Sequence, residues 1–214
     1  IKITLASSND IQIYYYSEIN FIKLFYLNKL IIYQEDEIMK NYFLLGLLIS
    51  SFNISTAEMI IGKENIHPGI DLIFEGAPKD MVHPKNYFRA ESATDIHIEM
   101  LANWSENAPT GSPLGGFVAY LNVEAFIESE SGKKTKVKLT PHLNISDNIH
   151  YAQNIKLPGK INELYKVTFK ISPPRNGELG IHYDWNTDVG SYINETVFEY
   201  SDLNFEEIAL SSRR

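Results

Sequence analysis

The stretch Thr94–Met100 reads TDIHIEM, and its side chains alternate between polar and apolar. This period-two pattern predicts a β-strand, in which side chains two positions apart lie on the same face. The two isoleucines and the methionine would face a core. The opposite face would carry Asp95, His97 and Glu99 side by side. That second face is either a solvated strand surface or half of a metal site.

Short alternating runs of the same kind recur along the chain, separated by turn-forming residues. We expect strands at Ile70–Glu75, Thr94–Asn103, Phe117–Glu128, Lys134–Leu139, Leu164–Ile171, Leu179–Tyr183 and Thr196–Tyr200. Glycine and proline gather between them, for example in residues 107–116 and 173–177. About seven short strands joined by such turns predict an all-β protein, an immunoglobulin-like antiparallel β-sandwich.

The composition limits which chemistry the chain can carry. Its 214 residues are 44% hydrophobic and 21% charged, as in a globular protein. The formal net charge of -8 argues against nucleic acid as a partner, because phosphate binding needs clustered lysine and arginine. No cysteine is present, so disulfides and thiolate metal sites are excluded. A bound metal would have to be held by histidine, methionine or carboxylate.

A targeting signal lies inside the chain and not at its start. From Met39 the sequence reads MKNYFLLGLLISSFNISTAE, with a basic Lys40, an apolar run over residues 43–52 and small residues up to Ala57. This order is typical of a secretory signal peptide, although a buried helix would also be apolar. We expect the signal peptide at residues 39–57 and an exported domain at 58–214. Residues 1–38 begin with isoleucine, and we interpret them as a non-native upstream extension.

Histidine is the scarce residue with metal-binding chemistry. The six histidines are His67, His83, His97, His142, His150 and His182. The sequence LNISDNI between His142 and His150 contains turn-forming residues, and it could fold back to bring both rings to one point. Imidazole together with carboxylate suits Fe(II), Cu(II), Zn(II) or Mn(II). Spacing alone leaves the alternative that these are ordinary surface or core histidines, which is how we interpret His67 and His83.

Five segments carry a resemblance to a known family. TDIHIEMLANW, GFVAYLNVEAFI, PHLNISDNIHYAQNIKLPG, YKVTFKISPP and IHYDWN follow one another between about Gly69 and Glu207. Together they resemble the bacterial periplasmic high-affinity ferrous-iron transport proteins, the soluble partners of oxidase-independent iron permeases. The most specific piece is HYAQNIKLPGKINELYKVTF.

The resemblance implies a periplasmic homodimer that captures Fe(II), also binds copper, and delivers iron to an inner-membrane iron permease without catalysing a reaction. The bound metals would be Cu(II) and Fe(II)/Fe(III). By resemblance, His97, His150 and His182 are ligands, with Glu99 as the nearby carboxylate. Asp147 and Tyr151 would orient the ligand rings.

One position departs from the family pattern. The family's methionine ligand lies seven residues before the histidine that corresponds to His150, and Leu143 stands there. Leucine cannot bind a metal, so either the adjacent His142 replaces the thioether or the site has one ligand fewer. Imidazole in place of thioether would make the site harder and reduce its preference for Cu(I).

Two functions of other classes compete with metal transport. A metal-dependent enzyme of the superoxide dismutase type also places histidines on a β-sandwich, but it needs a His-x-His run that this chain lacks. A non-catalytic interaction module with incidental histidines would bind no metal tightly. The ordered resemblance favours a metal carrier that is not an enzyme.

Overall fold

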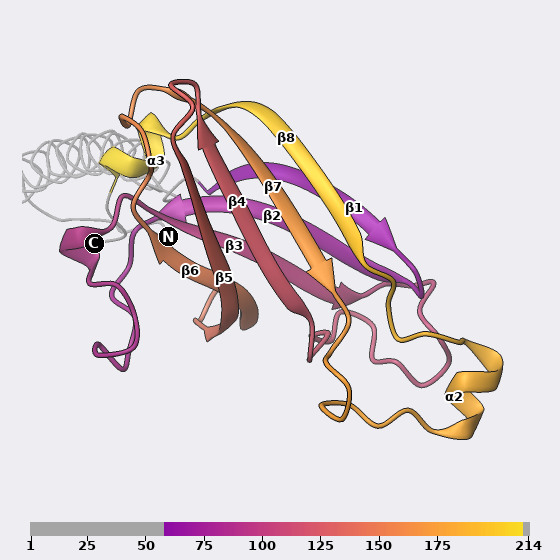
Figure 1. The fold of residues 1–214 in the computed structure, drawn as a ribbon. Coiled ribbons are helices and arrows are strands. Elements are labelled where there is room, and N and C mark those ends of the chain that lie inside the picture. The colour runs from indigo at the N-terminus through magenta and orange to yellow at the C-terminus, as the bar shows by residue number, and fades with distance from the viewer. Residues whose placement is uncertain (1–57, 212–214) are drawn as a thin grey trace, which may run out of the picture. The chain divides into compact units, whose positions relative to one another are not determined.

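Eight β-strands dominate the described part of the chain, residues 58–211 of this computed structural model (Figure 1). They are β1 (Met59–Ile66), β2 (Ile70–Pro78), β3 (Ile96–Trp104), β4 (Asn122–Ser129), β5 (Lys134–Leu143), β6 (Ile149–Ile155), β7 (Leu164–Ser172) and β8 (Thr196–Asn204). All neighbours pair antiparallel in the order β1-β2-β3-β6-β5-β4-β7-β8. The prediction of an all-β antiparallel protein is confirmed.

The sheet folds over so that its first and last strands meet. Strand β5 makes the crossing, because Lys134–Leu139 pairs with β4 while Thr140–Leu143 pairs with β6. At the other side, the Tyr200 hydroxyl of β8 donates to the Glu64 carboxylate of β1 at 3.0 Å. Figure 1 shows β1 and β8 running beside each other. The result is a nearly closed, sandwich-like sheet, and the immunoglobulin-like subtype stays a prediction.

The inner face of the folded sheet is the hydrophobic core. Ile96, Ile98 and Met100 of β3 are each 0% exposed, as their alternation predicted. Phe74 of β2 stacks on Phe169 of β7 with 4.3 Å between ring centroids, which joins the two halves of the sheet. Offset aromatic stacking of this kind adds to the burial of apolar area.

The predicted strand at Leu179–Tyr183 is wrong. Residues 178–182 form no strand, and the short helix α2 (Tyr183–Asp188) begins where the strand was expected to end. No neighbouring strand among the described residues covers the alternating apolar side chains. Ile181 is therefore 44% exposed and Tyr183 is 85% exposed. Alternation alone does not make a strand where no partner backbone is available.

Two further boundaries differ from the prediction. The expected strand Phe117–Glu128 is shortened to β4, because Tyr120 adopts a φ of 62° and leaves the extended region. Phe117 keeps an isolated bridge to Asn103. Strands β1 and β6 were not predicted. In β6, polar residues interrupt the apolar alternation by which the other strands were predicted.

The remaining helical elements are short. A 3-10 turn spans Glu91–Ala93 and α3 spans Glu206–Leu210. Within residues 58–211, no helix has the length and apolar character needed to cross a membrane. The predicted upstream extension at 1–38 and the predicted signal peptide at 39–57 lie outside the described residues.

Replacing Phe74 by alanine should lower the free energy of unfolding by about 3–5 kcal/mol, because it removes a fully buried ring from the stack that joins the two halves of the sheet. Urea denaturation measures the loss. Tyr87→Ala is the control, since Tyr87 is 78% exposed and its removal should change stability by less than about 0.5 kcal/mol. Equal losses in the two variants would contradict the assigned core.

Candidate metal centre

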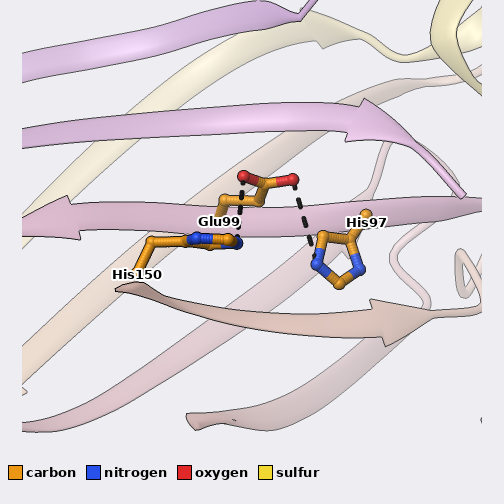
Figure 2. Close-up of side chains that lie close together, drawn as sticks. All are labelled: His97, Glu99 and His150. Atoms are coloured by element: carbon orange, nitrogen blue, oxygen red, sulfur yellow. Dashed lines mark ion pairs between the residues drawn. The ribbon is translucent and has the colours of Figure 1, made fainter. Parts of the chain in front are cut away.

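A buried group of two imidazoles and one carboxylate lies on the face of β3 that points away from the core. His97 and Glu99 are two residues apart in β3, and His150 comes from the adjacent strand β6. The Nε2 atom of His97 is 3.8 Å from Glu99 Oε1, and that of His150 is 3.5 Å from Glu99 Oε2. Figure 2 shows the carboxylate placed between the two rings. The three residues are 3%, 0% and 1% exposed, so the reading of this face as a solvated surface is wrong.

The hydrogen bonds of the rings fix which nitrogen faces the carboxylate. The Asn154 amide Nδ2 donates to the carbonyls of Asp80 and Arg89 at 2.8 and 3.0 Å, so its Oδ1 is the acceptor toward His97 Nδ1 at 2.7 Å. His97 therefore carries its proton on Nδ1. The His150 Nδ1 likewise donates to the Asn148 carbonyl at 3.1 Å. In both rings Nε2 therefore faces Glu99, as a lone-pair donor when the ring is neutral and as an N–H when it is protonated.

This orientation is the one that a cation requires. A carboxylate and two nitrogen lone pairs that face one another repel unless positive charge lies among them, which ring protons or a metal ion can supply. One donor atom from each of the three residues lies within 4.8 Å of the others. Carbonyl or amide partners on the far ring nitrogen are also the usual means by which proteins orient metal-binding histidines.

A third imidazole, His142, adjoins the group. It pairs with His150 across β5 and β6, because the turn between them folds back. Its ring centroid is 5.2 Å from that of His97 and 6.3 Å from that of His150. The Nε2 atom of His142 is buried and has no hydrogen-bond partner among the described residues. Burial, together with the nearby His150, lowers the pKa of His142 to about 4, so the ring is neutral and can act as a donor at pH 7.

The departure at Leu143 has a simple structural basis. Alternation along β5 turns His142 inward, where it is 9% exposed, and Leu143 outward, where it is 73% exposed. The side chain at the family's methionine position thus lies at the rim. The imidazole next to it lies beside the other two rings.

His182 lies elsewhere in the chain. It precedes α2, beside Trp104 and Trp185 at the far end of β3. Seven residues of strand separate Trp104 from His97, a distance of about 23 Å at the usual rise per residue. Within one chain, His182 therefore cannot share an ion with the other histidines. The expected orienting residues also lie elsewhere: the Tyr151 hydroxyl donates to the Val118 carbonyl in the core, and Asp147 accepts hydrogen bonds from Asn144 and Ser146 in the turn.

A cavity of about 440 Å³ opens beside the cluster. His97, His142 and His150 line it from the sheet, and residues 80–83 with Phe88 line it from the segment after β2. Sequence patterns did not place Met81 or His83 here, since the position of this segment depends on long-range contacts. Asn154 was also missed, although it lies in the family-like segment HYAQNIKLPG.

The fold and the donors together define the class of the protein. It is an all-β protein whose buried imidazole and carboxylate groups can hold a transition-metal ion. The sequence model of the Fe2+ transport protein family matches residues 55–207, and the chain belongs to this family. The predicted family is confirmed. Its members are described as transport proteins, so the chain is not an enzyme and the dismutase alternative falls.

Individual relatives agree with this assignment. The 34 kDa membrane antigen of Treponema pallidum (strain Nichols) is 31% identical over 120 residues, which are 55% of this chain and 58% of that protein. The chain thus spans less than two thirds of this relative. Among solved structures, a copper-bound variant of Campylobacter jejuni P19 superposes with a TM-score of 0.59 and 26% identity, over 68% of this chain and 96% of that one.

A copper-bound variant of FetP from uropathogenic Escherichia coli strain F11 shows the same fold. Its TM-score is 0.58 at 24% identity, and the match covers 68% of this chain and 95% of that one.

Asn154→Ala should lower the free energy of unfolding by about 3 kcal/mol, because it removes one buried and two partly buried hydrogen bonds and leaves their partners unpaired. Backbone amides of residues 81–88 should also exchange with solvent faster, since the bonds to Asp80 and Arg89 hold both ends of this segment. Denaturation and amide hydrogen exchange measure the two effects. Asn122→Ala, which removes two exposed hydrogen bonds, one to the Pro173 carbonyl and one from Lys138, should leave both unchanged; a similar effect there would refute the assigned role.

Proposed function

We propose that the protein captures ferrous iron in the periplasm, binds copper at the same site, and delivers iron to an inner-membrane iron permease. The observation that carries the proposal is the buried group of His97, Glu99 and His150, in which the Nε2 atom of each ring faces the carboxylate. Imidazole and carboxylate donors suit Fe(II) and Cu(II). Family membership and the copper-bound relatives support both metals.

His142 is the fourth ligand in this proposal. Its neutral, buried Nε2 beside the other rings can provide the bond that Leu143 cannot. A set of three imidazoles and a carboxylate has no thioether donor, so it should favour Fe(II) and Cu(II) over Cu(I) more strongly than a methionine-containing site would.

His182 enters the proposal only through a second copy of the chain. One chain cannot bring it to the cluster, so its predicted role as a ligand requires a homodimer in which the α2 end of one protomer reaches the metal centre of its partner. Periplasmic location is supported by the predicted signal peptide.

The test is an equilibrium metal titration of the protein isolated from the periplasm, with Cu(II) in air and Fe(II) under nitrogen. The parent should bind one ion per chain. The double variant His97→Ala, His150→Ala should bind both ions at least about a hundredfold more weakly, because removal of orienting groups alone costs up to about that factor.

His67→Ala is the matched control, since His67 is exposed in the β1–β2 turn and precedes a proline. Its affinity should equal that of the parent. Negligible uptake by the parent, or equal uptake by the parent and the double variant, would refute metal capture at this site.

A further inference from the structure

The proposed ligands are too deeply buried for a hydrated ion to reach directly. His97, Glu99 and His150 are at most 3% exposed, and His142 is 9% exposed. An ion that is captured and later delivered must still enter and leave. The cavity that His97, His142 and His150 line offers such a passage.

Two metal-binding side chains of the segment after β2 line this cavity. Met81 is half-buried and His83, two residues further on, is exposed. The lining of the cavity thus includes the buried imidazoles of the site, a half-buried methionine and an exposed histidine. Both side chains bind borderline and soft ions, and each can replace a water molecule of a hydrated ion.

The position of this segment is tied to the metal centre itself. The Asn154 amide donates to the carbonyl of Asp80 just before Met81 and to that of Arg89 beyond the segment's far end. The same amide accepts the His97 Nδ1 proton. The Met81 backbone N–H donates to the Asp80 carboxylate at 2.6 Å. The backbone that carries Met81 into the lining of the cavity is therefore held at a place fixed relative to His97.

We propose that Met81 and His83 are the exchange ligands of an access path, which take up an ion at the cavity mouth and pass it to His97, Glu99 and His150. This proposal rests on the proposed function. An ion that moves from one protein ligand to the next never has to lose all its waters in a single step, which lowers the barrier to loading and to release alike. Because these ligands act in passage, they change rates and leave the equilibrium affinity unaltered.

The experiment compares the double variant Met81→Leu, His83→Ala with the parent. Cu(II) is presented as the complex of a weak chromophoric chelator, and stopped-flow absorbance follows its transfer to the protein. Removal of bound copper by excess EDTA gives the release rate, and an equilibrium competition gives the dissociation constant. The variant should load and release copper about tenfold more slowly, a barrier increase of about 1.4 kcal/mol, with the same dissociation constant as the parent.

The matched control is Met59→Leu, His67→Ala. Met59 is half-buried in β1, and His67 is an exposed histidine before a proline, as His83 is, but neither lines the cavity. This variant should match the parent in both rates. Equal melting temperatures of all three proteins establish that the comparison is between folded molecules.

Each result decides the matter. Unchanged rates in Met81→Leu, His83→Ala would overturn the access path while leaving metal capture intact. Faster release from the variant, with a dissociation constant raised by the same factor, would overturn it too. Met81 and His83 would then be ligands of the bound ion at equilibrium. A parent that binds no copper would refute the proposed function, and the access path with it.

Discussion

The burial of the Glu99 carboxylate is the constraint on which the rest of the site depends. Removing a carboxylate from water costs several kcal/mol unless positive charge and hydrogen bonds compensate. Here the side chain is 0% exposed on a strand whose other face is hydrophobic core. The compensating charge is a ring proton or a bound metal ion, and β6 helps to hold it, because this strand lies beside β3 and provides both His150 and the Asn154 amide that orients His97. The antiparallel pairing of two strands thus creates the charge environment of the site.

Asn154 links that environment to the surface. One amide fixes the tautomer of a buried histidine and holds both ends of the segment that carries Met81 and His83. The Asn154 amide therefore sets both the orientation of the His97 ring and the position of this segment. The polar residues that interrupt the alternation of β6 are therefore those that build the centre, and the strand is recognisable only once its partner β3 is known.

The polar–apolar alternation of the sequence was sufficient to predict features that depend on a single strand. TDIHIEM predicted the core-facing side chains and the neighbouring placement of His97 and Glu99, because period two is a property of the strand alone. Leu179–Tyr183 failed for the opposite reason, since its alternation has no partner strand to bury it. The family-like segments led to His150, and the turn before it led to His142. Burial of the outer face and the position of Met81 and His83 depend on long-range packing, which no local pattern contains.

The central claim is that this buried face of β3 binds a metal ion, and locating the ion tests it most directly. Crystals of the protein loaded with Cu(II), measured at the copper absorption edge, reveal the ion by anomalous scattering. The account predicts one strong peak per chain within bonding distance of the Nε2 atoms of His97 and His150, about 2.0–2.1 Å by analogy with zinc–imidazole bonds. A peak confined to an exposed histidine such as His67, with none at Glu99, would contradict it.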